Sequence, residues 1–273
     1  MEDKTKFYQA KLKEPEFLKI SKFIEENFGI KLPPTKLIMV QNRLYKRLIA
    51  TGIYSFEEYV SFIFSLKGKF ELDNMVDVIT TNKTEFFREK EHFQYLQDNI
   101  FNLNKNKTFK IWSAGCATGE EVYSLAIIAE IANVKYSIIG NDISNQALQI
   151  AKKGLYSSNK LNNVSKNIIL KYFDKLLIDN KEYFKVKDSI KVNINFIKLN
   201  LKKDLDSFSE DFDIIFLRNV LIYFNMKTQN EILKKVINHL KPEGYLFIGL
   251  SEAIYDRQLK IKRVGPSIYQ KKY

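Results

Sequence analysis

Two glycines and two carboxylates stand close together in segment 111–121, which reads IWSAGCATGEE. The segment follows a short apolar run and opens a helical pattern, and in an open α/β sheet ligands bind beyond the carboxyl ends of the strands. Gly115 and Gly119 allow a sharp turn and a close approach of the backbone to a ligand. Glu120 and Glu121 would repel a pyrophosphate, so they suit a ligand with hydroxyls and a positive centre. In the plainer interpretation they only favour the helix N-terminus.

A third carboxylate, Asp142, ends the next strand-like run, KYSIIGND. It stands about 20 residues beyond the glycine loop, where an acidic residue is placed to accept both hydroxyls of a ribose. Asp142 could instead cap the following helix, but Ser144 is available for that task. The glycine loop and Asp142 together predict a nucleoside ligand. A nucleoside with a cationic centre suggests S-adenosylmethionine (AdoMet).

A polar pair, Arg218 and Asn219, interrupts the apolar segment IIFLRNVLIYF. The pair directly follows a run of strand length, so it falls at the carboxyl end of a predicted strand. Packing alone would not require these residue types there. Tyr223, further along, is surrounded by apolar residues, and from the residues alone core packing is the better interpretation for it.

These segments need a parallel sheet to bring them together. After about residue 105, short apolar runs alternate with helical patterns, which is typical of a parallel sheet with helices on its faces. The segment KPEG is expected to form a turn before the last of these strands, YLFIGLS. The stretch at about 155–192 breaks this alternation, with the runs ILKYFDKLL, KEYFKVK and SIKVNI, and we interpret it as a small antiparallel insertion. The first ~75 residues have helical periodicity, with helix stops at Gly29 and Gly52. The predicted fold class is α/β, preceded by an all-helical domain.

The composition limits the class of protein. The 273 residues include one cysteine, Cys116, so no intramolecular disulfide can form, and this fits a reducing compartment. The first residues have no apolar signal core and no window approaches about 18 apolar residues, so we expect a cytoplasmic protein without a membrane span. The net charge of +12 would attract nucleic acid, anionic lipid or an acidic protein, although a solvated lysine-rich surface is the plainer interpretation.

The order and spacing of the motifs resemble the CheR family of chemotaxis-receptor glutamate methyltransferases, from about Glu16 to the C-terminus. The matching segments are TTNKTEFFRE, IWSAGCATGEEVYSLA, NDIS, AKKGLY, LNL, FLRNVLIYF, LKPEGYLFIGLSE and YQKK. The resemblance implies a Rossmann-like class I methyltransferase sheet. It also implies a helical receptor-recognition domain at 1–76, a linker helix at 77–107 that contributes to the AdoMet site, and the methyltransferase domain at 108–273.

The resemblance assigns roles to individual residues. Arg88 and Tyr223 are the expected catalytic residues, which hold the attacking carboxylate near the transferring methyl group. Glu120 stays unassigned, since only one of the paired glutamates need point inward. The expected AdoMet contacts are Asn82, Thr84, Arg88, Glu121, Asp142, Asn200, Leu201, Arg218 and Asn219.

The implied reaction methylates glutamate side chains of methyl-accepting chemotaxis receptors and leaves S-adenosylhomocysteine (AdoHcy), without a metal. A glutamate is ionised at pH 7, so no general base is needed. The predicted helix 35–51 has no acidic residue, and Arg43, Lys46 and Arg47 share one face of it at i, i+3 and i+4. By the same resemblance, this face is expected to dock on the acidic methylation region of the receptor's cytoplasmic helical bundle.

Three alternatives compete with this interpretation. A nucleic-acid methyltransferase fits the charge, but such enzymes usually carry an (Asn/Asp)-Pro-Pro-aromatic motif where this chain reads RNVLIYF. The intact glycine loop and Arg88 argue against a non-catalytic AdoMet-binding receptor adaptor. The glycine spacing disfavours an NAD enzyme. We therefore expect no nucleic-acid partner.

Members of the resembled family can bind a receptor's C-terminal peptide as an added strand of the insertion, and those that do so carry a glycine-rich turn there. Here the stretch 172–186, YFDKLLIDNKEYFKV, contains no glycine. Side chains at Leu177, Ile178 and Lys181 would crowd an incoming strand. We therefore expect no C-terminal pentapeptide tether, and recognition through the basic helix alone.

Overall fold

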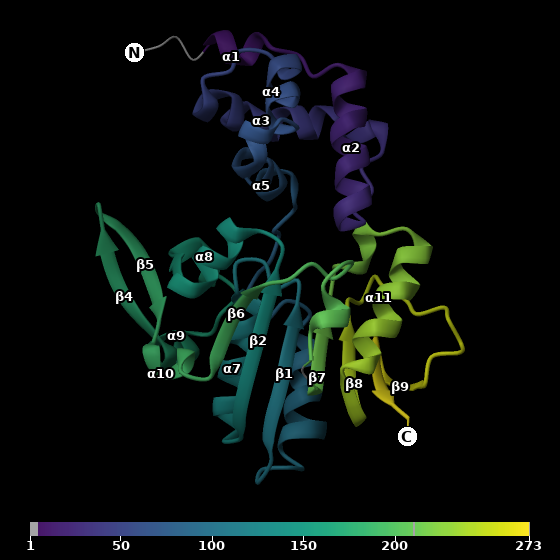
Figure 1. The fold of residues 1–273 in the computed structure, drawn as a ribbon. Helices are drawn as coiled ribbons and strands as arrows, with labels where there is room; N and C mark the ends of the chain where they lie inside the picture. Colours follow the sequence, from purple (N-terminus) through teal and green to yellow (C-terminus); the bar gives the residue numbers. More distant parts are fainter. Residues whose placement is uncertain (1–4, 210, 273) are drawn as a thin grey trace. The chain divides into compact units, whose positions relative to one another are not determined.

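The computed structural model describes residues 5–209 and 211–272, and the chain divides into two compact units (Figure 1). The first unit extends to Thr81 and also contains Tyr223–Asn225. The second unit comprises Asn82–Ile222 and the chain from Met226 onward. No helix in the described ranges is long and apolar enough to cross a membrane.

The first unit is helical, as predicted. Its α2 and α3 helices end at Gly29 and Gly52, where φ values of 77° and 68° require the left-handed region that glycine tolerates. Ser55 caps α4 by accepting the N–H of Glu58. A bridge between Ile30 and Phe224 attaches the short segment from the later chain. The elements are α1 (Thr5–Gln9), α2 (Glu14–Phe28), η1 (Pro34–Lys36), α3 (Leu37–Thr51), α4 (Phe56–Ile63), η2 (Leu66–Gly68) and α5 (Lys69–Ile79).

The second unit is built on a seven-stranded sheet in the order β6-β2-β1-β7-β8-β10-β9. The first five strands in this order are parallel neighbours, and β10 pairs antiparallel with both β8 and β9. This arrangement confirms the predicted Rossmann-like sheet. The strands are β1 (Thr108–Ala114), β2 (Lys135–Asp142), β6 (Ile194–Lys198), β7 (Phe212–Leu217), β8 (Leu240–Ile248), β9 (Ile261–Gly265) and β10 (Ile268–Lys271).

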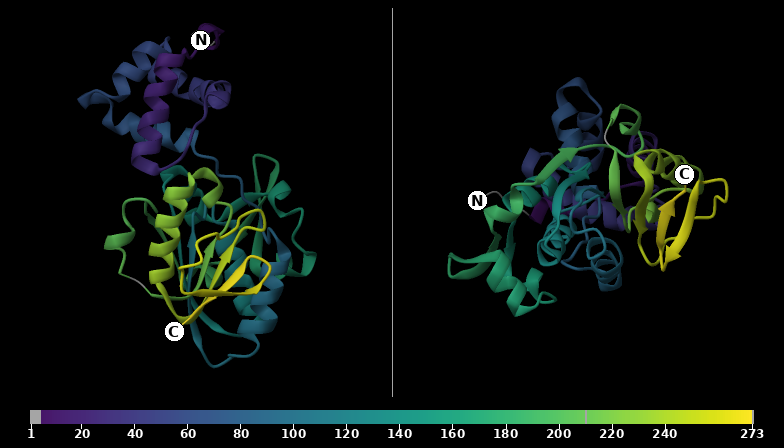
Figure 2. Two further views of the ribbon diagram at one scale, coloured as in Figure 1. Left: turned by 90° about the vertical axis from the view of Figure 1, so that its right-hand side faces the viewer. Right: turned by 90° about the horizontal axis from the view of Figure 1, so that it is seen from below.

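Helices cover both faces of this sheet, with α7 on one face and α11 on the other (Figures 1 and 2). Every residue of β7 is buried, as expected for a strand covered on both sides. The remaining elements around the sheet are α6 (Lys90–Tyr95), the π-helix η3 (Leu96–Phe101), α7 (Glu120–Ala132), α8 (Asn145–Lys153), η5 (Leu205–Ser207), η6 (Leu221–Tyr223) and α11 (Met226–Asn238).

The insertion contains the predicted small antiparallel sheet, in the order β3-β5-β4. Its β4–β5 hairpin projects from the larger sheet (Figure 1) and turns through Asp179 and Asn180, whose φ values of 47° and 58° suit a two-residue turn. The elements are β3 (Leu155–Ser157), η4 (Ser158–Leu161), α9 (Lys166–Tyr172), β4 (Phe173–Ile178), β5 (Lys181–Val186) and α10 (Asp188–Lys191).

Two local expectations were wrong. The run SIKVNI does not continue the insertion as an alternating strand, because α10 forms a single helical turn that buries Ile190 before β6 begins. The segment KPEG is not a turn before the last parallel strand but lies inside β8. Pro242 has no N–H to donate, and it stands where the β7–β8 register shifts and Glu243 takes a φ of 61°.

Candidate cofactor site

Four segments singled out in the sequence leave the sheet at the same edge. The order β6-β2-β1-β7 makes their strands parallel neighbours, so their carboxyl ends lie side by side. The glycine loop follows β1, Asp142 ends β2, Asn200 follows β6, and Arg218 follows β7. This is the edge at which open α/β sheets bind ligands.

The glycine loop turns through left-handed backbone. Gly115 and Gly119 have φ values of 78° and 93°, and Ala117 between them has 48°. A Cβ atom at Gly115 would lie 2.6 Å from Val220, so a side chain is excluded by contact as well as by φ. The N–H groups of Gly115 and Cys116 both donate to the Asn141 carbonyl, which anchors the loop to the end of β2.

Asp142 fixes the same loop with its side chain. Its Oδ2 accepts the N–H of Ala117 and its Oδ1 accepts the N–H of Ser144, both at 2.9 Å, and it is 8% exposed. Ser144 caps α8 as predicted, through the N–H of Ala147. A carboxylate offers about four acceptor positions, so these two bonds are compatible with ligand hydroxyls.

The paired glutamates point to different neighbours. Glu120 is fully buried, with Oε1 2.9 Å from Lys160 Nζ in the insertion and Oε2 accepting the Thr118 hydroxyl at 2.6 Å. Glu121 is 14% exposed, and its Oε2 lies 3.0 Å from Arg218 Nε. Glu121 is therefore the glutamate that remains part of the candidate site.

Arg218 is buried, at 5% exposure, and contacts several segments of the chain. Its Nη2 donates to the backbone carbonyl of Arg88 at 2.5 Å, and its guanidinium lies over the rings of Phe93 and Phe216. The ion pair with Glu121 lacks hydrogen-bond geometry, because no acceptor lies in line with the Nε–H. Arg218 thus positions the chain at Arg88 as well as lying beside a candidate cofactor residue.

His92 is held neutral beside Arg218. Its Nε2 lies 3.2 Å from the Pro266 carbonyl, which only accepts, so Nε2 carries the hydrogen. Its Nδ1 then accepts from Arg218 Nη1 at 3.1 Å. Burial lowers the pKa of His92 and the neighbouring guanidinium lowers it further. This histidine is a structural acceptor that the sequence reasoning had not singled out.

Segment 82–89, which carries Asn82, Thr84 and Arg88, is held by its phenylalanines. The Phe87 N–H donates to Ser124 Oγ at 2.9 Å, and the Phe86 ring packs edge-on against Tyr156. Phe87 and Glu89 both have positive φ, near 55°, which is strained backbone for residues with a Cβ.

Arg88 itself is only partly buried. Its guanidinium donates to the Lys83 carbonyl at 3.3 Å, and none of the carboxylates in the described ranges pairs with it. The neighbours of Arg88 therefore fix its backbone and leave its charge uncompensated.

Two further glutamates, Glu89 and Glu252, organise the turn after β7. Both lie in motifs of the resembled family, but no role was predicted for either from the sequence. Glu252, 8% exposed, accepts the N–H groups of Gly249, Asn219 and Ile222 at 2.7, 2.9 and 3.3 Å. Asn219 has a φ of 58°, and its Nδ2 donates to Glu89 Oε1 at 3.2 Å. Burial raises the pKa of Glu252, although the backbone N–H groups oppose this.

The segment after β6 is organised by its own short-range bonds. Asn200 Oδ1 accepts the N–H of Lys202 at 3.0 Å, and the N–H of Asn200 donates to Asp204 Oδ2 at 2.7 Å. Leu201 is buried, at 6% exposure. An apolar residue and a backbone turn at this edge suit the face of a flat base.

Tyr223 belongs to the first unit, where its carbonyl accepts the N–H of Lys31 at 3.0 Å. Its ring is half-buried, so it is not one of the core side chains. No hydrogen bond to its hydroxyl is found within residues 5–209 and 211–272. The core-filling interpretation therefore does not describe this side chain.

Two of the three basic residues on α3 are engaged inside the first unit. Arg43 donates to the carbonyls of Ile79 and Thr80 and to the Thr81 hydroxyl. Arg47 makes a two-point contact with Glu71, at 2.8 and 2.6 Å. Lys46 is exposed and has no such contact among the described residues.

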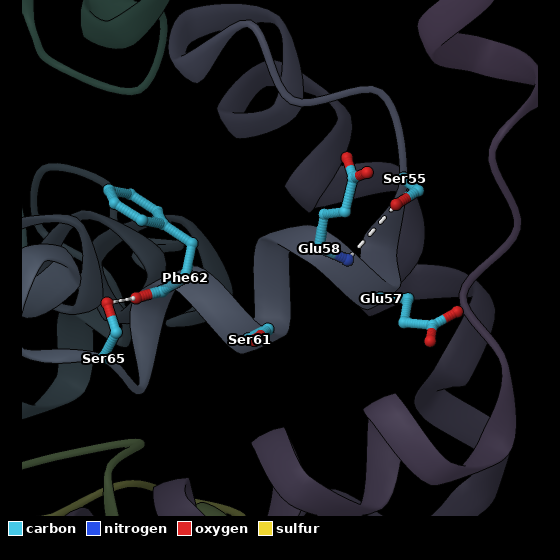
Figure 3. A pocket seen from close by; sticks show the side chains of 6 residues that line it. All are labelled: Ser55, Glu57, Glu58, Ser61, Phe62 and Ser65. Atoms are coloured by element: carbon cyan, nitrogen blue, oxygen red, sulfur yellow. Dashed lines mark hydrogen bonds between the residues drawn. The ribbon is translucent and has the colours of Figure 1, made fainter.

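A shallow hollow of about 670 Å³ lies beside α4 in the first unit (Figure 3). Its walls are mostly exposed serine and glutamate side chains, so it encloses no buried polar group for a ligand. None of its lining residues belongs to the candidate cofactor site. Its lining residues are Ser55, Glu57, Glu58, Ser61, Phe62 and Ser65.

In the part of the chain that the structure describes, no group of three His, Cys, Asp or Glu could hold a metal ion.

Comparison with known families gives two matches that together span most of the chain. The family described as "CheR methyltransferase, SAM binding domain" matches residues 82–269. The family described as "CheR methyltransferase, all-alpha domain" matches residues 15–80.

The chain is also similar to individual proteins named chemotaxis protein methyltransferases. The chain is 36% identical over 269 residues to a chemotaxis protein methyltransferase of Borreliella burgdorferi, covering 94% of each chain. It is 32% identical over 262 residues to that of Escherichia coli, covering 94% of this chain and 91% of the other. Among solved structures, PKMT2 from Rickettsia typhi in complex with AdoHcy matches at 20% identity and a TM-score of 0.39, over 62% of this chain and 26% of that one. A TM-score this low does not by itself establish a common fold.

Proposed function

Because this chain belongs to the CheR methyltransferase family, we propose that it transfers the methyl group of AdoMet to glutamate side chains of chemotaxis receptors. The observation that carries the proposal is the convergence of the glycine loop, Asp142 and Glu121 at one edge of the sheet. The names of the relatives, chemotaxis protein methyltransferases, support the receptor as the substrate.

The residues at this edge fit AdoMet chemically. Asp142 accepts from ligand hydroxyls, as a ribose requires, and Glu121 offers a carboxylate to a cationic group. When bound, AdoMet supplies an electrophilic methyl group on sulfonium sulfur. The contacts we propose are those of Asn82, Thr84, Arg88, Glu121, Asp142, Asn200, Leu201, Arg218 and Asn219.

The acceptor needs little activation from the protein. A glutamate side chain is already ionised at pH 7, so no general base is required. His92, held neutral between Pro266 and Arg218, is not needed as one. The protein's contribution is then alignment and exclusion of water, and alignment can be worth about 7–11 kcal/mol in well-oriented systems.

Arg88 and Tyr223 are the residues that we propose for this alignment. The Arg88 guanidinium has no acidic partner among the described residues, so it can orient an incoming carboxylate. The Tyr223 hydroxyl, without an internal hydrogen bond in the described chain, can donate to the same group. A tight grip by Arg88 would reduce the nucleophilicity of the carboxylate, so we propose orientation rather than a two-point pair.

Receptor recognition is assigned to α3, the acid-free helix. Arg43 and Arg47 both donate hydrogen bonds within the first unit, whereas Lys46 is exposed, so Lys46 carries the clearest free charge of the three. We assign Lys46 the leading role in docking on an acidic receptor surface, with Arg43 and Arg47 adding long-range attraction.

A C-terminal receptor tether is not part of the proposal. β4 is an edge strand, so its backbone could pair with another strand. Leu177 is 69% exposed on it and Ile178 is 41% exposed at the tight turn, which lacks glycine. We propose that these exposed side chains hinder the approach of an added strand.

The product chemistry tests the proposal. The purified protein is incubated with AdoMet and membranes that carry the organism's own chemotaxis receptors, and receptor peptides are then analysed by mass spectrometry. The proposal predicts methyl groups on receptor glutamates and none in a reaction without AdoMet. Methyl groups on lysine only, or on added RNA only, would contradict it and favour a different acceptor.

A further inference from the structure

We propose that Lys160, in the insertion, is a positioning residue for the AdoMet site, which it serves by compensating buried Glu120 and tying segment 82–88 to the glycine loop. The inference rests on the proposed use of AdoMet. Under this proposal, the insertion contributes a residue that positions the cofactor site.

The charge on Glu120 needs a partner from outside its own helix. Glu120 opens α7 directly after the glycine loop and is 0% exposed. Its Oε2 accepts the Thr118 hydroxyl, and its Oε1 lies 2.9 Å from Lys160 Nζ, the only ion pair that Glu120 makes among the described residues. A buried carboxylate without a cation is costly, so the position of Lys160 decides whether the loop can keep this conformation.

Lys160 reaches a second segment as well. Its Nζ donates to the Thr84 carbonyl at 3.4 Å. The same part of the insertion adds two bonds, from the Tyr156 hydroxyl to the Thr118 carbonyl at 2.7 Å and from Asn163 Nδ2 to Glu85 Oε2 at 3.3 Å. The insertion therefore contacts both the glycine loop and the segment that carries the proposed cofactor and catalytic residues.

Segment 82–88 and Glu120 are also linked by hydrogen bonds that do not involve the insertion. The Phe87 N–H donates to Ser124 Oγ, and Ser124 Oγ donates to the Glu120 carbonyl at 2.7 Å. Glu120 is thus connected to this segment through its backbone on one side and through Lys160 on the other. Loss of the Lys160 charge should displace the Glu120 side chain and loosen the segment.

The binding test uses AdoHcy, the reaction product, and titration calorimetry on the full chain. Lys160→Met keeps the apolar stem and removes the charge, and we expect it to weaken AdoHcy binding at least tenfold. Lys160→Arg restores a cation and should bind within about threefold of the natural protein. Lys181→Met is the matched control, since Lys181 is an exposed lysine on β5 of the same insertion, and it should change nothing.

The double variant Glu120→Gln with Lys160→Met separates charge compensation from direct ligand contact. It removes the buried charge together with its partner, while the amide still accepts from Thr118. We expect it to recover most of the affinity that Lys160→Met loses. If the double variant binds no better than Lys160→Met, or if Lys160→Met binds like Lys181→Met, the inference is overturned.

A second readout needs no ligand. In the cofactor-free protein, hydrogen exchange at the Phe87 amide should be faster in Lys160→Met than in the natural protein and Lys181→Met. Unchanged exchange contradicts the proposed link. Failure of the natural protein to bind AdoHcy would instead count against the proposed function, and the exchange comparison would still decide the role of Lys160.

Discussion

Asp142 Oδ2 accepts the backbone N–H of Ala117 at 2.9 Å, so the carboxylate expected to bind ribose also fixes the turn of the glycine loop. Asp142→Ala should therefore weaken AdoHcy binding by about 2–3 kcal/mol, through loss of charge-assisted hydrogen bonds to the ribose and a looser loop. Titration calorimetry measures this directly. Unchanged affinity in a variant with normal circular dichroism would remove Asp142 from the site.

Arg88→Ala and Tyr223→Phe should separate binding from catalysis. Neither side chain supports a buried charge, so both variants should keep their unfolding free energy within about 0.5 kcal/mol. Arg88→Ala should lower both AdoHcy affinity and kcat, whereas Tyr223→Phe should lower kcat alone. A Tyr223→Phe enzyme that methylates receptors at the natural rate would show that the hydroxyl has no catalytic role.

Lys46→Glu should raise the KM for receptor membranes and leave AdoHcy affinity unchanged, because Lys46 is the exposed cation of the α3 face. The effect should shrink at high salt, since it is electrostatic. Arg47→Ala is the informative contrast. It removes the cation paired with Glu71, which is 6% exposed, and should destabilise the first unit by roughly 2–3 kcal/mol. An unchanged KM for Lys46→Glu at low salt would argue against docking through α3.

The lowered pKa of His92 makes stability depend on pH. The unfolded chain binds a proton near pH 6.5 that the folded chain binds only at lower pH, so the unfolding free energy should fall as the pH drops below about 6.5. The loss from this residue should reach at most about 1.4 kcal/mol per pH unit.

Urea unfolding between about pH 5 and 7 checks this, with His92→Gln as the comparison. His239 is present in both proteins, so its contribution cancels. The pH dependence should be weaker in His92→Gln, and identical slopes in the two proteins would rule out His92 as the source.

The C-terminal peptides of the organism's receptors should bind more weakly than roughly 10 μM, or about −7 kcal/mol. The reason is the glycine-free turn and the side chains of Leu177 and Ile178 on the edge strand. Calorimetry with each peptide decides the matter. A clear low-micromolar isotherm with any of them would show that the insertion takes an added strand after all.

The sequence predicted the strand ends that carry the site because short apolar runs and parallel topology leave few alternatives. The glycine loop, Asp142 and Ser144 all took the positions expected of their local pattern. Glu120 is different, because its partner Lys160 lies in another element. Nothing in a segment reading GEE distinguishes the glutamate that faces the insertion from the one beside Arg218.

The other features that the sequence did not predict depend on contacts between distant parts of the chain. His92 bonds to Pro266, and Glu252 collects the N–H groups of the turn at Asn219. Arg47 shares a helix face with Lys46, as predicted, but only the fold shows that Glu71 binds it. A helical pattern gives the face on which a charge lies, and it does not give the partner that meets the charge.

The most direct test of the central claim is a methyl-transfer assay with tritiated AdoMet, the purified protein, and either receptor-bearing membranes or RNA. Glutamate methyl esters are hydrolysed by base and release volatile methanol, whereas methylated bases and methylated amines are stable. We predict base-labile label in the receptor fraction and none in RNA, with loss of the label in Arg88→Ala. Base-stable label, or label in RNA alone, would contradict a receptor glutamate methyltransferase.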